Sequence, residues 1–318
     1  MNALDLHAHF TAPELLDRVR KDGWRWRISV AESPGAIRLQ FGWDQFSRPF
    51  FPAMLDLTGR EQWLAARGIA GQVLSPWMDL AAYHLPPEQE LAWARVLNDT
   101  MAAAIAGRPA FRAFAHIPLG SGWAAAAELE RAVCELGFVG GQVGTHGADG
   151  KGLGSPHLAP LWQAAAALEV PLLLHPHGVA EAGAGPLHLL TRYPLATTEA
   201  ALELFQAGVP DRHPHLAIIL IHGGGFLPYQ VGRFARSLGS AFADCLRFFY
   251  YDTVVDAASL RFLAERVGWE RLVLGSDAPF ALGGPDPVAT VTAAQPPAHA
   301  LDLVLRQTGA RLTRGWPA

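Results

Sequence analysis

Cysteine, lysine and long hydrophobic runs are all scarce in this chain of 318 residues. It contains two cysteines, Cys134 and Cys245, which argues against a disulfide-stapled secreted scaffold and predicts a reduced, cytoplasmic protein. The longest apolar runs, such as residues 216–221, are far shorter than the roughly 20 residues that span a membrane. Asp5 and two histidines interrupt the N-terminal stretch, so we expect no signal peptide and no membrane partner.

A strong charge of one sign is also lacking. Charged residues make up 17% of the chain and the formal net charge is −4, so no basic surface for nucleic acid is expected. Hydrophobic residues make up 50%, which predicts a large core. We therefore expect the partner to be a small molecule.

Apolar strands and helical patterns alternate along most of the chain. A first strand within residues 1–10 is followed by an irregular, aromatic-rich insertion, 11–58, of short strands and loops with one short helix at 13–21. Seven more strands are expected at 69–75, 111–117, 138–143, 170–175, 216–222, 247–252 and 271–277, and helices at 59–67, 86–107, 123–136, 157–168, 197–208, 256–267 and 299–308. Continuous apolar strands separated by helices are typical of a parallel sheet covered on both faces. Eight such strands predict an α/β fold, a distorted (β/α)8 TIM barrel, as one domain spanning 1–318 with its insertion near the N-terminus.

Five polar side chains stand where these strands end. His7 and His9 are two residues apart, so on a strand their imidazoles share one face, and His175, His222 and Asp277 end later strands. Enzymes of this fold assemble their sites at that end of the barrel. Each residue alone could be a capping or hydrogen-bonded group, but together they predict a site built from metal ligands and proton carriers.

The motifs that carry these residues resemble the amidohydrolase superfamily, and within it the branch typified by α-amino-β-carboxymuconate-ε-semialdehyde decarboxylase. The similar segments cover nearly the whole chain and read DLHAHF, SRPFFPAMLD, GQVLSPW, GGQVGTH, LLLHPH, LIHGGGFLPYQVGR and LGSDAPFALG. The resemblance implies a barrel enzyme that depends on a divalent metal and needs no organic cofactor.

The resemblance also implies a ligand set for one metal ion, which would be held by His7, His9, His175 and Asp277. Zinc is the expected metal, with manganese as the alternative, because three imidazoles and a carboxylate do not discriminate sharply between them. Binuclear relatives use a lysine in the fourth strand. That strand, 138–143, has no lysine here, which predicts a mononuclear site.

Further roles follow from the same resemblance. His222 would be the acid/base that exchanges a proton with a metal-activated water, and Asp277 would also accept a hydrogen bond from that water. Arg48 and Arg233 match positions that bind a substrate carboxylate, with Arg233 supplied across a homodimer interface. The alternatives are a solvated loop arginine for Arg48 and a surface or intersubunit ion pair for Arg233.

The sequence departs from the family beside the expected pocket. His177 stands where a tryptophan is usual, and it could bind a substrate carboxylate or hydroxyl or simply be packed. The loop 178–196 lacks the usual tryptophans, and His146 could line the same rim. These differences leave the exact substrate open.

Three functions are compatible with this pattern. The favoured one is a non-oxidative decarboxylase of a small aromatic or unsaturated, muconate-type carboxylic acid, because two arginines suit a carboxylate that must be held. A hydrolase or hydratase acting on a lactone, an amide or a double bond would use the same activated water. A silent metal-binding or regulatory protein is disfavoured, since candidates remain at all five signature positions.

Overall fold

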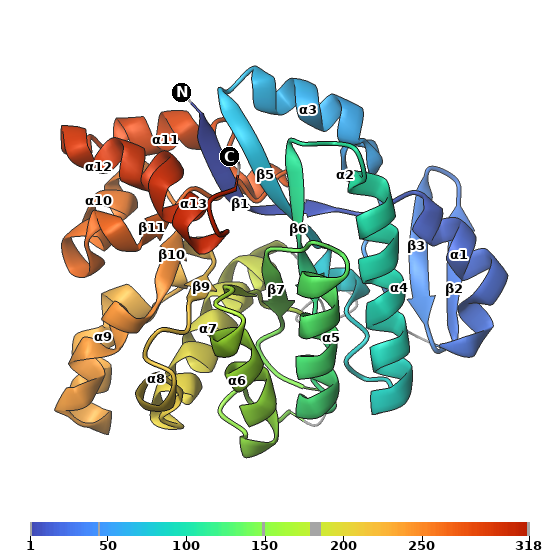
Figure 1. Cartoon of the computed structure of the whole chain (residues 1–318), viewed down its shortest axis with the longest axis horizontal. Helices are drawn as coiled ribbons and strands as arrows, with labels where there is room; N and C mark the ends of the chain where they lie inside the picture. The colour runs from blue at the N-terminus through green and yellow to red at the C-terminus, as the bar shows by residue number, and fades with distance from the viewer. Residues whose placement is uncertain (1, 44, 148–149, 179–185, 317–318) are drawn as a thin grey trace.

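The computed structural model describes residues 2–43, 45–147, 150–178 and 186–316. Eight parallel strands, joined mostly by helices, lie side by side in chain order, β1-β5-β6-β7-β8-β9-β10-β11 (Figure 1). Their bounds are β1 Ala3–Phe10, β5 Ile69–Pro76, β6 Phe111–His116, β7 Gly140–Val143, β8 Leu172–Leu174, β9 Ile218–Leu220, β10 Tyr250–Asp252 and β11 Leu272–Val273. The predicted (β/α)8 barrel is thereby confirmed.

The two edge strands are joined by hydrogen bonds that close the barrel. The Leu6 amide donates to the Leu274 carbonyl at 2.8 Å, and the His9 amide donates to the Ala278 carbonyl at 2.7 Å. The Asp277 amide donates to the His7 carbonyl at 2.8 Å. This closure places the segment that follows β11 directly beside the His7 and His9 end of β1.

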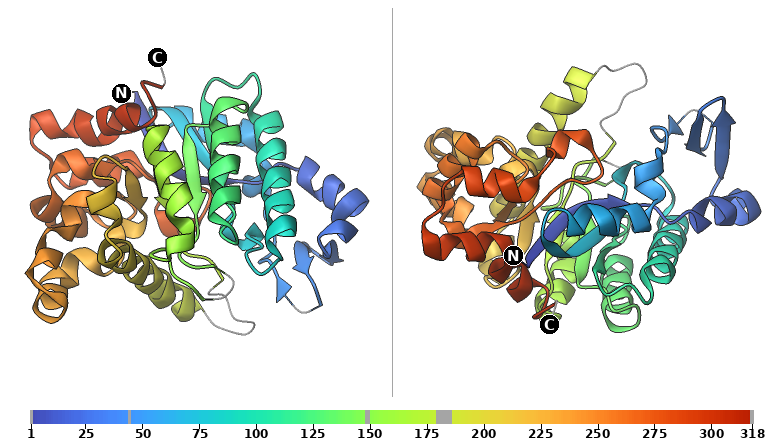
Figure 2. Two further views of the ribbon diagram at one scale, coloured as in Figure 1. Left: turned by 60° about the horizontal axis from the view of Figure 1, so that its bottom comes forward. Right: turned by 90° about the horizontal axis from the view of Figure 1, so that it is seen from above.

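Helices form the outer layer around the strands (Figures 1 and 2). The longer ones are α3 Leu57–Ala65, α4 Pro87–Ile105, α5 Gly122–Cys134, α6 Ala159–Ala167, α7 Pro186–Gln206, α9 Leu227–Leu238 and α10 Ala257–Val267. Shorter helices are α2 Pro52–Leu55, α8 Val209–Arg212, α11 Pro287–Ala293, α12 Ala298–Asp302 and α13 Thr308–Leu312. Some N-termini are capped as the sequence suggests: Ser121 accepts from the Ala124 amide before α5, and Asp256 accepts from the Ala258 and Ser259 amides before α10.

Two apolar layers hold the barrel together. One fills its interior with fully buried side chains from alternate strand positions, among them Leu6, Phe114, Leu173 and Ile219. A larger one lies between the strands and the surrounding helices. Each fully buried side chain of this kind contributes roughly 1.5–3 kcal/mol relative to exposure, so the strands near the site are rigid supports.

The insertion contains α1 Glu14–Asp22 and a three-stranded antiparallel sheet of β2 Ile28–Ser33, β3 Ala36–Phe41 and β4 Gln45–Phe46. It projects beside α4 (Figure 2, right). Pro34 and Gly35 form the turn between β2 and β3, where Gly35 has φ +78°, a conformation that glycine adopts readily. The insertion has its own core, in which Trp26 and Phe41 pack against Trp93 of α4.

The observed helices differ from the expected ones in two places. The helix expected at 197–208 begins at Pro186, because Pro194 is accommodated inside α7 instead of preceding it. The helices expected from the sequence did not include α9, although its pattern is amphipathic. The last strand is also shorter than the expected 271–277, since residues 274–278 continue toward β1 mainly as an irregular segment.

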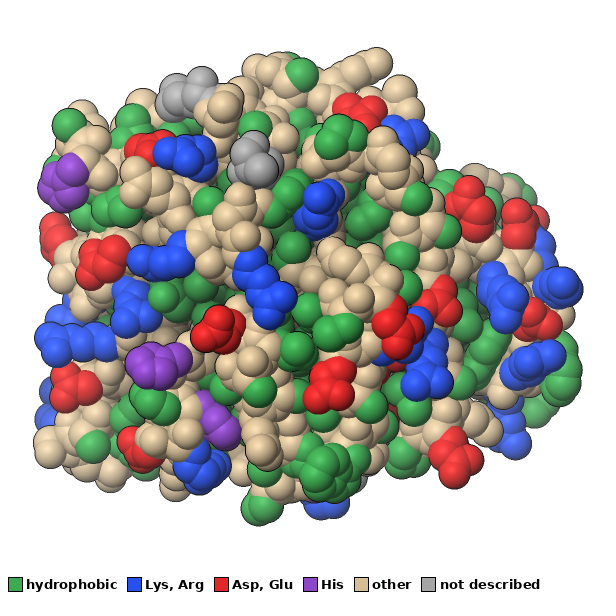
Figure 3. All heavy atoms as spheres, viewed as in Figure 1, with side chains coloured by type: hydrophobic (Ala, Val, Ile, Leu, Met, Phe, Trp, Pro, Cys, Tyr) green, Lys and Arg blue, Asp and Glu red, His purple; other side chains and the backbone are tan. Residues whose placement is uncertain are grey.

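The surface agrees with the modest net charge. Basic and acidic side chains are interspersed over the face drawn in Figure 3. Within the described ranges, no helix combines the length and apolar character needed to cross a membrane.

Candidate active site

Four of the predicted side chains converge at the carboxyl ends of the strands. His7 and His9 come from β1, His175 follows β8 and Asp277 follows β11, and one ligand atom from each lies within 4.8 Å of the others. The Nε2 atom of His9 is 3.3 Å from that of His7 and 3.1 Å from that of His175. The Asp277 Oδ1 atom is 3.3 Å from His9 Nε2 and 3.5 Å from His7 Nε2. All four residues are buried.

This spacing fits a single cation. Four ligands placed tetrahedrally at roughly 2.0–2.1 Å from one ion lie about 3.3 Å from one another. Four of the six distances between the ligand atoms, at 3.1–3.5 Å, match that separation, and all six are within 4.8 Å. Among the described residues this is the one group of histidine, cysteine and carboxylate side chains with such convergence.

The outer ring nitrogens determine which way the lone pairs point. His7 Nδ1 lies 2.6 Å from Asp252 Oδ2, and His175 Nδ1 lies 2.7 Å from the Pro176 carbonyl oxygen. Both partners are acceptors, so each Nδ1 carries the proton and each Nε2 presents a lone pair toward His9. Lone pairs that face each other at this distance repel unless a cation lies between them. Converging lone pairs of this kind are the donor set that a metal requires.

The electrostatics of the four groups also favour a cation. Burial lowers the pKa of His9, and it holds the pKa of His175 well below the usual range. Burial alone would raise the pKa of Asp277, but contacts with His222 and His9 hold it well below the usual range. Burial acts to lower the pKa of His7 as well, yet the hydrogen bond to Asp252 and the charge of Asp277 raise it. A positive charge is therefore stabilised beside His7.

His222 stands next to this group without belonging to it. It begins a short 3₁₀ turn, His222–Gly224, directly after β9, and its φ of +54° is unusual for a residue with a side chain. Its Nε2 atom is 3.8 Å from Asp277 Oδ2, and its ring centroid lies 5.8 Å from that of His7. The side chain is 18% exposed, whereas His7 and His9 are fully buried. This is a suitable position for a group that exchanges protons with a bound molecule.

Arg48 is held by an aspartate that the sequence analysis did not single out. Its Nε and Nη2 atoms donate to the two carboxylate oxygens of Asp79 at 2.9 and 2.7 Å. The guanidinium also lies over the rings of Trp77 and Phe280, at 5.2 and 5.7 Å from their centroids. One bidentate edge of Arg48 is thus occupied, and the Nη1 and Nη2 edge is what remains for a second anion.

Tyr193 of α7 is a further aromatic neighbour of the site that the sequence gave no signal for. Its ring lies 6.3 Å from that of His222 with 13° between the planes, and 6.3 Å from that of His175. Burial raises the pKa of its hydroxyl to about 12, and the charges of Arg48 and Asp277 are close enough to act on it. The hydroxyl makes no hydrogen bond within the described part of the chain.

His177, which is buried, and His146, which is half-buried, lie in a separate cluster. The two rings stack at 4.3 Å between centroids, and His177 also contacts the Tyr83 ring at 4.5 Å. His177 Nδ1 accepts from the Thr145 amide at 3.3 Å, and burial holds the pKa of His177 well below the usual range. These contacts favour a packed histidine over a ligand of substrate. Of the segment 178–196, which was expected to be a loop, residues 186–196 belong to α7 and residues 179–185 lie outside the described residues.

Arg233 forms no hydrogen bond or ion pair with the four ligand residues in the described part of the chain. It is exposed on α9 and makes no hydrogen bond or ion pair among the described residues. Phe226 and Tyr229 nearby are also exposed. A role for Arg233 in the site would require a second copy of the chain.

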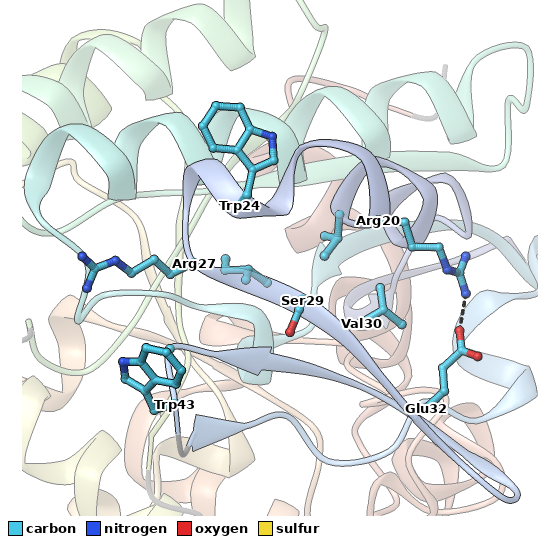
Figure 4. Close-up of a pocket in the computed structure, with 10 residues that line it drawn as sticks. Arg20, Trp24, Arg27, Ser29, Val30, Glu32 and Trp43 are labelled. Carbon is cyan, nitrogen blue, oxygen red and sulfur yellow. Dashed lines mark hydrogen bonds and ion pairs between the residues drawn. The ribbon is translucent and has the colours of Figure 1, made fainter.

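A separate groove lies away from this site. It has a volume of about 820 Å³ and lies on the insertion, where Trp24, Arg27 and Trp43 line it together with Ser29 and Val30 (Figure 4). None of its lining residues belongs to the histidine site. The groove therefore does not mark the chemistry.

The sequence matches a protein-family model over nearly the full length of the chain. The family model described as Amidohydrolase matches residues 4–312. The chain belongs to the amidohydrolase family. The resemblance read from the sequence motifs is confirmed at this level.

Named relatives of this amidohydrolase are mostly decarboxylases. It is 27% identical over 299 residues to 2-amino-3-carboxymuconate-6-semialdehyde decarboxylase of Dictyostelium discoideum, covering 88% of this chain and 82% of the relative. It is 31% identical over 250 residues to gamma-resorcylate decarboxylase of Rhodococcus jostii, covering 72% of this chain and 69% of the relative. A relative of another class, 2-keto-4-carboxy-3-hexenedioate hydratase of Sphingobium, is 27% identical over 313 residues, covering 90% of this chain and 86% of the relative.

Solved structures agree with this assignment. Crystal structures of 2,6-dihydroxybenzoate decarboxylase, one from Rhizobium and one complexed with 2,6-dihydroxybenzoate, match with a TM-score of 0.76 at 27% identity. Each match covers 99% of both chains. The fold of this amidohydrolase therefore matches, over its whole length, that of an enzyme whose structure holds an aromatic carboxylate.

Proposed function

We propose that this chain is a metal-dependent, non-oxidative decarboxylase of small aromatic or unsaturated carboxylic acids. The observation that carries the proposal is the buried convergence of three imidazoles and one carboxylate, with His222 beside it and outside the ligand set. The relatives' names support the reaction class. No organic cofactor is needed for this chemistry.

The metal would be held by His7, His9, His175 and Asp277. Zinc is the first candidate and manganese the second, since the donor set accommodates either. When bound, a divalent ion would supply positive charge that polarises an oxygen of the substrate or of water. The absence of a lysine in β7 supports a single ion.

His222 would move the proton in this reaction. Decarboxylation breaks the bond between the ring or alkene carbon and its carboxylate, releases carbon dioxide, and leaves an electron pair on that carbon. His222 Nε2 would deliver the proton that takes this electron pair. Asp277, whose Oδ2 atom is 3.8 Å from His222 Nε2, would help to orient the imidazole toward the substrate.

Arg48 and Tyr193 would hold the substrate. The free Nη1 and Nη2 edge of Arg48 can pair with a carboxylate, while Asp79 and the rings of Trp77 and Phe280 keep the guanidinium in place. The Tyr193 hydroxyl would donate a hydrogen bond to a substrate oxygen. We assign no contact with substrate to His177, which is packed instead.

We also propose a homodimer in which Arg233 reaches the site of the partner subunit. Its exposure on α9, beside the exposed Phe226 and Tyr229, supports an interface on this helix. Sedimentation would show a dimer, and Arg233→Ala would raise KM for the acid. A fully active monomer would remove Arg233 from the site.

The test is release of carbon dioxide from a panel of hydroxybenzoic and muconate-type acids by zinc-loaded and manganese-loaded protein. We expect release from at least one acid, and loss of it in His222→Ala with the metal content unchanged. His299→Ala, a change at an exposed histidine of α12, is the matched control and should behave as the unchanged protein. Equal loss of metal and activity in His222→Ala would show that His222 is a ligand instead.

The second candidate is a hydratase or hydrolase. The hydratase among the relatives favours it, because hydration of a double bond uses the same kind of site. Parallel assays for water addition to unsaturated acids and for lactone and amide hydrolysis distinguish it. Turnover in those assays, without carbon dioxide release from any acid, would replace the decarboxylase proposal.

A further inference from the structure

Asp252 is a fully buried carboxylate at the end of β10, and its contacts extend beyond His7. It lies between β9, which leads to His222, and β11, which leads to Asp277. Both of its carboxylate oxygens make hydrogen bonds, and each oxygen contacts a different part of the site. Asp252 Oδ2 contacts His7 Nδ1 at 2.6 Å, and Asp252 Oδ1 accepts from the Gly223 amide at 2.8 Å and the Val254 amide at 3.2 Å.

The first contact determines the protonation of His7. An acceptor at 2.6 Å from Nδ1 holds the ring proton there, so that Nε2 keeps its lone pair toward His9 and Asp277. It also fixes the rotation of a ring that is only 3.3 Å from His9 Nε2. Without this acceptor, His7 could carry its proton on Nε2 and would no longer be a ligand.

The second contact determines the backbone that carries His222. His222 and Gly223 both have left-handed conformations, with φ of +54° and +62°. The turn is tight, because a Cβ atom at Gly223 would come within 2.7 Å of the Val255 side chain. Asp252 Oδ1 takes the amide hydrogen of Gly223 in this turn, and the hydrogen bond therefore opposes relaxation of His222 away from Asp277.

We propose that Asp252 is a positioning residue that fixes two groups at once: the tautomer of the metal ligand His7 and the turn that aims the acid/base His222. The two functions are separable, because each carboxylate oxygen serves one of them. The His7 part rests on the metal site, and the His222 part also rests on the proposed decarboxylase function. Asp252 touches neither substrate nor metal in this arrangement.

The test is Asp252→Asn, which keeps the size of the side chain but replaces one acceptor oxygen by an NH2 donor. If the amide oxygen stays on Gly223, its NH2 group faces His7 Nδ1 and favours the wrong tautomer. If the amide turns over, its NH2 group faces two amide hydrogens and the turn loses its acceptor. Either orientation removes the contact with His7 Nδ1 or the contact with the Gly223 amide, so the variant cannot replace the carboxylate.

The first readout is metal affinity, measured by competition with a chromophoric zinc chelator. We expect Asp252→Asn to bind zinc about 10–100-fold more weakly than the unchanged protein. The matched control is Asp256→Asn, four residues further along, where an exposed aspartate caps α10 and asparagine caps equally well. Unchanged zinc affinity in Asp252→Asn would overturn the His7 part.

The second readout is turnover at saturating zinc. Excess metal compensates for weakened affinity but not for a displaced His222, so we expect kcat to stay at least tenfold low with KM changed less than about threefold. Complete recovery of kcat at saturating zinc would overturn the His222 part. If no acid is decarboxylated by the unchanged protein, the proposed function fails while the zinc competition still decides the His7 part.

A third readout needs no variant and covers the case in which Asp252→Asn does not fold. Nitrogen-15 spectroscopy of the unchanged, zinc-loaded protein should show a His7 Nδ1 proton that is shifted far downfield and exchanges slowly, because it lies between two buried atoms. A His7 ring without a proton on Nδ1 would overturn the proposal.

Discussion

Two histidine clusters lie at the same end of this barrel, and they differ in what surrounds them. In the first, His7, His9 and His175 direct ring nitrogens at one point, with the carboxylate of Asp277 beside them. In the second, His146 and His177 present ring faces to each other, at 4.3 Å between centroids and 26° between planes. The first arrangement leaves lone pairs that need a cation, and the second leaves apolar faces in contact. Ring orientation and a nearby carboxylate, more than the number of histidines, distinguish a metal site from a packed cluster.

The second cluster also has a different electrostatic environment. His116 stacks on Tyr83 at 5.2 Å, and its Nε2 atom is buried without a hydrogen-bond partner in the described structure. Burial lowers the pKa of His116 to about 4. Burial lowers the pKa of His146 and His177 as well, although the charge of Glu199 acts in the opposite direction on His146. His7, by contrast, contacts Asp252 directly and its pKa is raised.

Substitution of two histidines that are separated by one residue should distinguish the two clusters most clearly. His175→Ala removes one of four ligands and should abolish zinc binding and turnover together. His177→Ala removes ring contacts with Tyr83 and His146, and should keep bound zinc while lowering the free energy of unfolding by about 2–4 kcal/mol. Metal analysis, activity and denaturant unfolding on both variants test this. Loss of zinc in His177→Ala would mean that the second cluster belongs to the metal site.

Removing the metal from the unchanged protein should give the next largest effect. A ligand bound only by the folded state at about 1,000 times its dissociation constant stabilises that state by about 4 kcal/mol. Chelation should therefore lower Tm by roughly 8 °C or more and abolish activity, with both restored by zinc or manganese. Thermal unfolding with and without a chelator measures this. A Tm that does not respond to chelation would contradict a metal buried between β1, β8 and β11.

The smallest effect concerns the pH dependence of stability. His116 has a pKa of about 4 in the folded protein against 6.5 for the free side chain, so protons favour the unfolded state. Its contribution to stability is present above pH 6.5 and is lost as the pH falls toward 4, by roughly 3 kcal/mol in total. His116→Phe keeps the stacking on Tyr83 but cannot take up this proton.

Unfolding by urea at pH 7, 5.5 and 4.5 should therefore show a steeper loss of stability in the unchanged protein than in His116→Phe. The contributions of titratable groups that both proteins share, including the metal ligands, cancel in the difference between their free energies of unfolding. Parallel loss of stability in the two proteins would contradict a buried, neutral His116.

The fold could be predicted from the sequence because its signal is repetitive. Apolar strands such as 216–222 alternate with helices along the chain, and the eight-stranded order follows from that alternation. The four ligand candidates could be predicted because each stands at a strand end, and parallel strands in a barrel bring their ends together. The start of α7 could not, since Pro194 is tolerated in the helix only in its three-dimensional context.

Other parts of the site depend on contacts between distant segments. Asp252 ends an apolar strand, RFFYYD, so its position was a usable signal, but its partners His7 and Gly223 lie far away in the sequence. Asp79 likewise follows a strand, and only the folded chain shows that it takes one edge of Arg48. Tyr193 has no sequence signal at all, because its neighbours His175 and His222 are set by the packing of α7.

The most direct test of the metal site is the zinc and manganese stoichiometry of the full chain, measured by equilibrium titration of metal-free protein beside His175→Ala. We expect one ion bound per chain, none in His175→Ala, and recovery of carbon dioxide release in proportion to the bound ion. Two ions per chain, or one ion that persists in His175→Ala, would contradict the assignment of His7, His9, His175 and Asp277 as the metal site.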